Sequence, residues 1–482
     1  MYSGYEKIIA GCLVAGMLGA AGMAAASPGE HGRHEGTDRL IIKFSSERPN
    51  PEIASELMGK RLGWTMRYQR VTGMGSHVLK LDQVHPQADV QALANQIAAQ
   101  PGVAYAEPDT ILRRVLTPDD PGYPSQWHYY EATGGINAPA AWDQNQGSGV
   151  IVAVLDTGYR PHHDLAANLL AGYDMISDPF VANDGDAVRD ADASDPGDHV
   201  LAGQCGGGYP AEDQNSSWHG THVAGTVAAL TNNTSGVAGV AYNAKVLPVR
   251  VLGRCGGYTS DIADAIVWSA GLGVDGVPAN NNPARVMNLS LGGGGSCSRT
   301  MQSAIDLATG QGSAVVVAAG NSASNTKRAT PANCRNVVAV AATTRTGSRA
   351  YYSNSGKEVD LSAPGGDMRS DYRNGILSTL NMGTTVPGDD AYAWYQGTSM
   401  ATPHVSGVAA LMLSAKPELS AGDVESLLKS SARAFPSSCS GCGSGILDAD
   451  AAVTAAISGG DSDGGDDGDG GDTRPCRGKK CR

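Results

Sequence analysis

One sequence feature limits the fold more than any other: short, continuous apolar runs alternate with segments of helical character. The run Val150 to Leu155 is bounded by Gly149 and Asp156, and suits a strand buried on both faces of a parallel sheet. Similar runs lie at residues 245–251, 285–291, 314–319 and 337–341. The helical segments lie at residues 219–230, 260–270, 300–311 and 402–415. This alternation predicts an α/β domain with a doubly wound, mostly parallel sheet.

A smaller unit precedes this domain in the 482-residue chain. The patterns predict strands at 40–44 and 76–81, helices at 53–62 and 89–99, and an extended segment at 103–115. Two helices over a small antiparallel sheet make a plausible self-contained α+β unit. A polar stretch at 117–121 breaks the pattern, so we place the smaller unit at 27–116 and the larger domain at 117–457.

The N-terminus has the pattern of an export signal. Lys7 precedes an apolar, Gly/Ala-rich run from Ile8 to Ala26, which three alanines close. A charged start, an apolar middle and small residues at the end are typical of a secretory signal peptide, here residues 1–26. The alternatives are a membrane anchor and a lipobox ending at Cys12. The signal peptide predicts a secreted, extracellular protein without stable membrane anchoring.

Residues 458–482 form a tail of distinct composition. Residues 459–472 are Gly, Asp and one Ser, which cannot bury a core, so we predict disorder there. The last ten residues are basic, and binding of nucleic acid or another surface is the alternative to a plain tail. For the whole chain, the net charge of −13 argues against nucleic acid as a partner. The mean hydropathy of −0.21 argues against several membrane spans.

Nine cysteines are present, and eight remain once the predicted signal peptide is removed. An even number in an exported protein indicates disulfides. Proximity along the chain suggests the pairs Cys205–Cys255, Cys297–Cys334, Cys439–Cys442 and Cys476–Cys481, although eight cysteines allow 105 connectivities. Cys439-x-x-Cys442 has no second motif of the kind that a cysteine zinc site needs.

Three short motifs supply the groups for nucleophilic catalysis. Asp156 ends the first apolar run in Asp-Thr-Gly, His219 opens His-Gly-Thr-His, and Ser399 stands in Gly-Thr-Ser-Met-Ala before an apolar helix. A serine hydroxyl needs a base within hydrogen-bond reach, and the base needs a third group to hold its tautomer. Pro403 fits the first turn of the predicted helix, so Ser399 is expected at a helix N-terminus, where the dipole favours negative charge. His222 is interpreted as structural, because one acid–base histidine suffices.

These motifs resemble the three signatures of the subtilisin-like (subtilase, peptidase family S8) serine endopeptidases, and the resemblance covers residues 120–457. It implies that Asp156 orients and stabilises His219, that His219 is the general base and then the acid, and that Ser399 is the acylated nucleophile. Asn321, which follows a buried strand in Ala-Ala-Gly-Asn, would be the oxyanion-hole donor. Activity is then expected to fall below about pH 6, where His219 becomes protonated.

The resemblance also implies how substrate binds and how the enzyme matures. Substrate main chain would pair with Ser290, Leu291 and Gly292, with Gly256, Gly257 and Tyr258 as a second wall. The smaller unit is similar to an inhibitor I9-type propeptide, which assists folding and blocks the cleft. Self-cleavage is expected near residues 112–117. The implied partners are protein and peptide substrates and the chain's own propeptide, and the mature enzyme is expected to be a monomer.

Structural calcium is the expected cofactor. Residues 184–198 hold six Asp, and we predict that Asp186, Asp190, Asp192 and Asp195 bind Ca²⁺; a solvated acidic loop is the alternative. Four further residues resemble the family's first calcium loop: Asp164, Leu230, Asn232 and Val237. The spacing departs from the family's at both ends of that loop, by one missing residue before Asp164 and one added before Gly236.

The sequence therefore predicts a secreted, calcium-stabilised subtilisin-like endopeptidase that is made as a preproenzyme. Two other functions remain open at this stage. One is a dedicated processing protease with a single partner substrate. The other is an inactive subtilase fold used as a calcium-dependent binding module.

Overall fold

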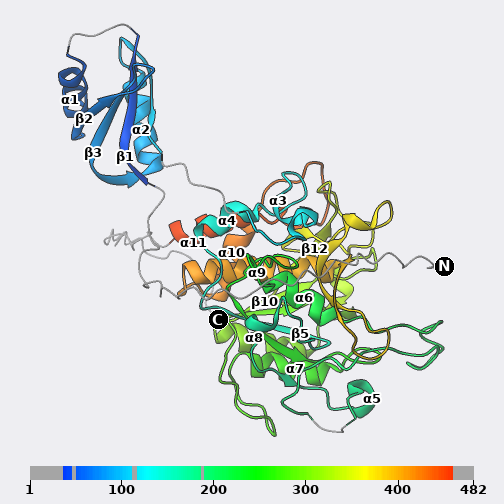
Figure 1. The fold of residues 1–482 in the computed structure, drawn as a ribbon. Helices are drawn as coiled ribbons and strands as arrows, with labels where there is room; N and C mark the ends of the chain where they lie inside the picture. The colour runs from blue at the N-terminus through cyan, green and yellow to red at the C-terminus, as the bar shows by residue number, and fades with distance from the viewer. Residues whose placement is uncertain (1–35, 46–49, 111–116, 186–188, 460–482) are drawn as a thin grey trace, which may run out of the picture. The chain divides into compact units, whose positions relative to one another are not determined.

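The structure, a computed structural model, describes residues 36–45, 50–110, 117–185 and 189–459 (Figure 1). The predicted signal peptide, the cleavage region, Asp186, and the tail with Cys476 and Cys481 lie wholly or mostly outside the described residues. The chain divides into two compact units, residues 1–114 and 115–482. Within the described residues, no helix is long and apolar enough to cross a membrane.

The N-terminal unit is an antiparallel sheet with two helices. Its elements are β1 (Gly36–Phe44), α1 (Pro51–Arg61), β2 (Met66–Val71), β3 (His77–Pro86), α2 (Gln87–Ala98) and β4 (Val103–Pro108). The strand order is β2-β3-β1-β4. The apolar face predicted for α2 is buried: Val90, Leu93, Ala94 and Ile97 pack on Leu40 and Leu79 of the sheet. The predicted α+β unit is thus present, with β2 as a strand that the sequence patterns did not indicate.

The second unit is built on a seven-stranded sheet of order β13-β12-β10-β8-β5-β7-β6. Every neighbouring pair in it is parallel. Its strands are β5 (Ile151–Asp156), β6 (Tyr173–Asp174), β7 (Lys245–Arg250), β8 (Val286–Leu289), β10 (Ala314–Ala318), β12 (Val338–Thr343) and β13 (Leu361–Pro364). Two smaller pairs are β9 (Gly293–Gly294) with β11 (Ala329–Thr330), and β14 (Ile376–Asn381) with β15 (Asp390–Tyr395).

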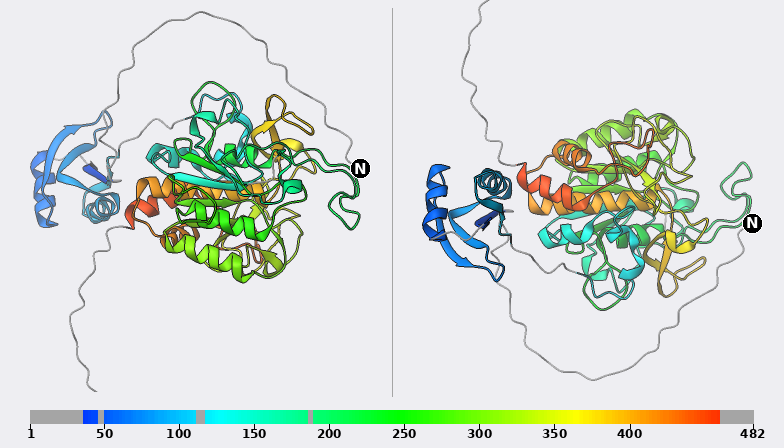
Figure 2. Two further views of the ribbon diagram at one scale, coloured as in Figure 1. Left: turned by 90° about the horizontal axis from the view of Figure 1, so that it is seen from below. Right: turned by 90° about the horizontal axis from the view of Figure 1, so that it is seen from above.

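Helices cover both faces of this sheet. They are α3 (Trp127–Tyr130), α4 (Ala138–Gln144), α5 (Pro179–Ala182), α6 (His219–Ala228), α7 (Thr259–Ser269), α8 (Arg299–Gly310), α9 (Thr398–Ala415), α10 (Ala421–Ser431) and α11 (Ala449–Ser458). Val152 and Val154 of β5 belong to a core with residues of α6, α9 and α11, whereas Ala153 and Leu155 belong to a second core with α7 and α8. Figure 2 shows α9, in orange, running through the middle of the unit. Alternate residues of one strand thus enter two different cores, as the predicted doubly wound sheet requires.

The long helix α9 corrects one prediction. It begins at Thr398 rather than near residue 402, so Pro403 lies inside the helix and not in its first turn. A proline lacks the N–H that would bond the carbonyl four residues earlier, here that of Ser399. The hydroxyl of Ser290 donates to the Ser399 carbonyl instead, at 2.7 Å. The early start places Ser399 in the first turn of α9.

Three of the four predicted disulfides are present: Cys205–Cys255, Cys297–Cys334 and Cys439–Cys442. Proximity along the chain was therefore a sufficient guide for the six cysteines that the structure describes.

Candidate active site

The carboxyl ends of three neighbouring strands hold most of the predicted site. Asp156 ends β5, Ser290 follows β8 and Asn321 follows β10, and these strands are adjacent in the order β10-β8-β5. Parallel strands present their carboxyl ends at one edge of a sheet, where ligands bind in open α/β folds. His219 and Ser399 reach the same edge from the first turns of α6 and α9, two helices that pack against each other.

A glycine allows α6 to begin beside the turn after β5. A Cβ added to Gly220 would lie 2.1 Å from the carbonyl oxygen of Gly158. No side chain fits in that space, so glycine at this position brings the start of the helix against the strand end. The backbone N–H of Gly220 also donates to Thr157 Oγ1 at 3.0 Å, which fixes the approach.

Asp156 and His219 form a close pair. The Nδ1 atom of His219 lies 2.7 Å from Oδ1 of Asp156, which is fully buried, while the His219 side chain is 21% exposed. Burial lowers the pKa of His219, but the charge and hydrogen bond of Asp156, with smaller contributions from Asp198 and Asp195, outweigh it. The pKa of His219 is therefore raised above its ordinary value.

Ser399 is held by hydrogen bonds to Ser290. Its hydroxyl donates to the Ser290 carbonyl at 3.1 Å, and its own carbonyl accepts from the Ser290 hydroxyl at 2.7 Å. Among the described residues, no hydrogen bond joins Ser399 to His219. The Ser399 hydroxyl would have to turn from the Ser290 carbonyl in order to meet the imidazole.

Asn321 is oriented by the start of α9. Its Oδ1 atom accepts from the backbone N–H of Thr398 at 2.8 Å and from the Thr398 hydroxyl at 2.9 Å. A Cβ placed on Gly397 would lie 3.5 Å from Asn321 Nδ2 and 3.6 Å from the backbone nitrogen of Ser399. Both nitrogens thus lie within 3.6 Å of one point beside Gly397, and their joint role in binding an oxyanion stays a prediction.

The predicted substrate segments lie on loops near these strand ends. Ser290 and Leu291 are buried, while Gly292 is exposed directly before β9. Gly256 and Gly257 precede Tyr258, whose exposed side chain donates to Asp178 at 3.3 Å. No peptide is present, so their pairing with substrate stays a prediction.

The carboxylate of Asp164 accepts hydrogen bonds from three groups of the protein. It accepts from Asn233 Nδ2 at 2.7 Å, Val237 N at 2.9 Å and the Tyr392 hydroxyl at 3.3 Å. The backbone N–H of Asn232 donates to Asp120, at 2.9 Å. Both oxygens of Asp164 accept hydrogen bonds in the structure, so a calcium ion there would have to replace some of these donors, and the predicted site stays a prediction.

Two arginines form ion pairs in and around the acidic segment. Arg250, which is buried, pairs with Asp174 and Asp184, and Arg189 pairs with Asp261 and Asp264 at 2.7 Å each. Of the segment's six carboxylates, that of Asp184 is therefore balanced by Arg250, while Arg189 of the segment pairs with carboxylates of α7.

Of the four predicted calcium ligands of this segment, Asp186 lies outside the described residues, and Asp190, Asp192 and Asp195 each accept hydrogen bonds from the protein. Asp195 accepts from the Thr157 hydroxyl at 2.7 Å and from Gly197 N at 2.8 Å. Asp190 and Asp192 likewise accept from the backbone N–H groups two residues further along the chain. Among the described residues, these carboxylates do not form a group of three or more ligand atoms close enough together to hold a metal ion.

Sequence reasoning missed the residues that hold the site together. Thr157 accepts from the backbone N–H of Gly220 next to His219, and Thr398 holds Asn321. Ser290, predicted only as a substrate-binding residue, bonds Ser399. All three were inside or beside a quoted motif, but a hydroxyl in a motif does not reveal its partner across 63 or more residues. His222, interpreted as structural, is fully buried and lies 3.0 Å from the carbonyl oxygen of Ile376 through Nε2.

Comparison with known proteins gives a consistent result. Residues 147–457 match the family described as the subtilase family. An extracellular protease of Xanthomonas campestris pv. campestris is 56% identical over 403 residues, which cover 83% of this chain and 67% of that protein. An extracellular basic protease of Dichelobacter nodosus is 43% identical over 440 residues, or 88% and 71% of the two chains. A solved protease structure from Pseudoalteromonas arctica has 60% identity and a TM-score of 0.69, and the match covers 71% of this chain and 100% of the other.

Proposed function

The chain belongs to the subtilase family of serine proteases, and we propose that it hydrolyses peptide bonds of proteins through Asp156, His219 and Ser399, with an acyl-enzyme on Ser399. The observation that carries this proposal is the convergence of the three motifs on one sheet edge, with His219 already bonded to Asp156 at 2.7 Å. The substrates are protein chains, bound in extended form.

His219 is the base of the proposed reaction. Its Nδ1–H donates to Asp156, which leaves the Nε2 lone pair free to take the proton of Ser399 as the serine oxygen attacks the scissile carbonyl carbon. Asp156 stabilises the imidazolium that forms, and His219 then returns the proton to the leaving amine. The reaction needs neutral His219, so the rate falls as the pH drops through its pKa.

Asn321 and the backbone N–H of Ser399 would receive the negative charge that develops on the carbonyl oxygen. Both donors flank the point beside Gly397 described above. Because Thr398 holds the amide of Asn321 in place, little reorganisation is needed during the reaction. The exposed backbone at Gly292 and the segment Gly256–Tyr258 would pair with the substrate main chain, which allows many sequences to bind.

We further propose that the protein is secreted and matures by cutting itself. The N-terminal unit forms its own sheet and core, as an independent propeptide domain requires. Two relatives are named as extracellular proteases. Loss of residues 1–26 on export, and of residues up to 112–117 by self-cleavage, would release an enzyme that begins before α3.

Calcium remains part of the proposal as a structural ion, with the Asp164 loop and the acidic segment at 184–198 as its candidate sites. Asp184 and Asp192 of the acidic segment are exposed, and Asp164 would exchange its present hydrogen-bond donors for the ion. A chelator should lower the thermal midpoint of the protein if either site binds calcium; an unchanged midpoint in EDTA would remove calcium from the proposal.

The decisive experiment compares wild-type protein with Ser399→Ala. The wild type should release a new N-terminus near residues 112–117, cut casein at many sites and react with a serine-directed phosphonate. The Ser399→Ala chain should fold, keep its N-terminal unit after export and fail to react. Casein cleavage at one site or none by a phosphonate-reactive enzyme would favour a dedicated processing protease, and absence of labelling in the wild type would favour a binding module.

A further inference from the structure

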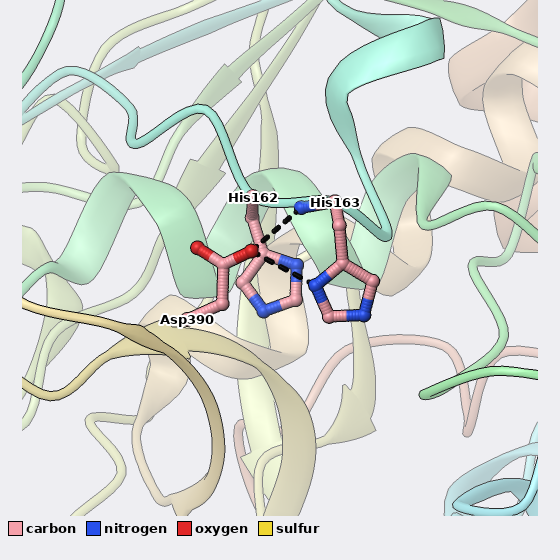
Figure 3. A group of neighbouring side chains, drawn as sticks. All are labelled: His162, His163 and Asp390. Atoms are coloured by element: carbon pink, nitrogen blue, oxygen red, sulfur yellow. Dashed lines mark hydrogen bonds and ion pairs between the residues drawn. The ribbon is translucent and has the colours of Figure 1, made fainter. Parts of the chain in front are cut away.

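Three side chains outside the proposed active site gather at the surface of the second unit: His162, His163 and Asp390 (Figure 3). The two histidines lie in the loop that follows β5, and Asp390 is the first residue of β15. One nitrogen or oxygen from each lies within 4.8 Å of the others. His162 is buried, while the other two are exposed.

His162 is held in one tautomer. Its Nδ1 atom accepts the backbone N–H of Asp164 at 3.1 Å, so Nδ1 carries a lone pair and no proton. Its Nε2–H therefore donates to the carbonyl oxygen of Ala391 at 3.0 Å. Donation from Nε2–H to a main-chain carbonyl is the outer contact typical of metal-binding histidines. A metal ion at Nδ1 would take the place of the Asp164 N–H.

His163 and Asp390 are positioned in a comparable way. The Nδ1 atom of His163 lies 2.8 Å from Oδ2 of Asp390, and this oxygen also accepts the backbone N–H of His163 at 2.8 Å. The Nε2 atom of His163 lies 3.1 Å from the Tyr392 hydroxyl and 3.2 Å from the Ser235 hydroxyl. Two hydroxyl groups thus hold Nε2 of the His163 ring, while Nδ1 faces the carboxylate of Asp390.

We propose that His162 Nδ1, His163 Nδ1 and Asp390 form a binding site for a divalent transition-metal ion, with Zn²⁺ as the expected ion. Two imidazole nitrogens and one carboxylate suit zinc, with water as a fourth ligand. Calcium prefers oxygen ligands throughout, so this site differs in kind from the calcium sites predicted from the sequence.

Binding requires a small local rearrangement. Zinc–ligand bonds of about 2.0–2.1 Å in a tetrahedron place the ligand atoms about 3.4 Å apart. The ion replaces the hydrogen bond between His163 and Asp390 and the one from Asp164 N to His162. The exposed side chains of His163 and Asp390 can move to close the site around buried His162.

The metal would join two segments that lead to the active site. His162 and His163 follow Asp156 along the chain, and β15 leads from Asp390 through Gly397 to Ser399. A ligand that binds only the folded state stabilises it in proportion to its concentration over its dissociation constant. Zn²⁺ should therefore hold the β14–β15 hairpin on the loop after β5 and raise the thermal midpoint.

The test is titration of ZnCl₂ into the full chain carrying Ser399→Ala, freed of metal with EDTA and followed by calorimetry. Added His163→Gln or Asp390→Asn should weaken zinc binding by more than about tenfold. Added Asp389→Asn, which removes an exposed carboxylate next to the site, should leave it unchanged. Heat of binding does not depend on the proposed catalytic role of Ser399, so failure of one proposal is distinguishable from failure of the other.

Cobalt supplies a second readout. Co²⁺ in the Ser399→Ala chain should show visible absorption typical of a four-coordinate site, and both ligand variants should lose it. Zinc titrations that are the same with and without Asp390→Asn, or an absence of zinc binding to the Ser399→Ala chain, would overturn the proposal. Equal weakening by Asp389→Asn and Asp390→Asn would do so as well, because it would indicate unspecific attraction to acidic groups.

Discussion

Two histidines one turn apart on α6 have opposite properties. His219 is partly exposed, bonded to Asp156, and has a raised pKa. His222 is fully buried, and burial lowers its pKa to about 3. Its Nε2–H lies 3.0 and 3.1 Å from the carbonyls of Ile376 and Ala393, and its ring stacks on Tyr395 at 4.7 Å. The same side chain thus favours its protonated form at one position and its neutral form at the other.

The difference shows that neighbours, rather than residue type or motif, decide the chemistry of each histidine. A carboxylate within hydrogen-bond distance favours the charged form, and an environment of carbonyls and apolar groups opposes it. His-Gly-Thr-His contains both residues, and only their partners from β5 and from the β14–β15 hairpin separate the two roles. Four changes test this contrast, from the largest expected effect to the smallest.

Asp156→Asn removes the neighbour that gives His219 its properties. The amide can favour the wrong imidazole tautomer, so kcat should fall about 10⁴-fold, while the fold is retained. The measurement is hydrolysis of a chromogenic peptide at pH 8, with the propeptide removed in trans and circular dichroism as the check on folding. A loss below about tenfold would contradict the assignment of Asp156.

Asn321→Ala separates charge stabilisation from proton transfer. Loss of one oxyanion donor typically lowers kcat by about 10²–10³. Because Asn321 does not touch His219, the pH at which activity falls should stay where it is in the wild type. A pH–rate profile of the variant checks both statements, and a shifted profile would mean that Asn321 acts through the histidine.

His222→Gln addresses the buried member of the pair. With a folded-state pKa of about 3 and an unfolded value near 6.5, His222 takes up a proton only on unfolding between these values. The free energy of unfolding should therefore fall as pH falls, by about 1.4 kcal/mol per pH unit from this residue. Glutamine keeps an N–H donor but does not titrate, so the variant should lose this part of the slope.

Urea unfolding of the Ser399→Ala chain, with and without His222→Gln, at pH 6.5 and pH 5 measures the difference. The comparison between variants is needed because burial raises the pKa of Asp195 to about 7, which acts in the opposite direction. Parallel slopes in the two chains would show that His222 is charged in the folded state.

Asp198→Asn should have the smallest effect. The charge of Asp198 helps to raise the pKa of His219, so its removal should move the acid limb of the pH–rate profile to lower pH. Asparagine retains an acceptor for the Ser217 N–H, which bonds Asp198 at 2.6 Å. Asp213→Asn serves as the control. Asp213 accepts a hydrogen bond from the backbone N–H of Ala202, and its replacement should leave the acid limb in place. An acid limb that does not move in Asp198→Asn, or that moves equally in the control, would show that Asp198 has no specific influence on His219.

Prediction from the sequence succeeded where the signal was local. The run Val150 to Leu155 indicated β5 because a strand buried on both faces must be apolar at successive positions. The apolar face of α2 followed from its period for a similar reason. The start of α9 was misjudged, because Pro403 was taken as a first-turn residue while its missing hydrogen bond is replaced from a distant strand end by Ser290.

The sequence was least informative about ion pairs and clusters between residues that lie far apart in the chain. The acidic segment at 184–198 suggested a bound cation, which stays a proposal, but its composition did not reveal that Asp184 pairs with Arg250. The cluster of His162, His163 and Asp390 joins residues that lie 227 or more positions apart. Neither a composition nor a spacing reveals such pairs, because a Coulomb interaction depends on distance in space.

The amino-acid sequence alone determined that the chain has a parallel α/β core, two units and three motifs with the groups for serine protease chemistry, since period, breakers and motif residues act over a few neighbouring positions. Only the tertiary structure decided which histidine faces a carboxylate, which carboxylates face arginines, and which loops lie side by side. The physical reason is that proton affinity and hydrogen bonding are set by atoms within a few ångströms, and packing of the sheet and its helices brings those atoms from distant parts of the chain.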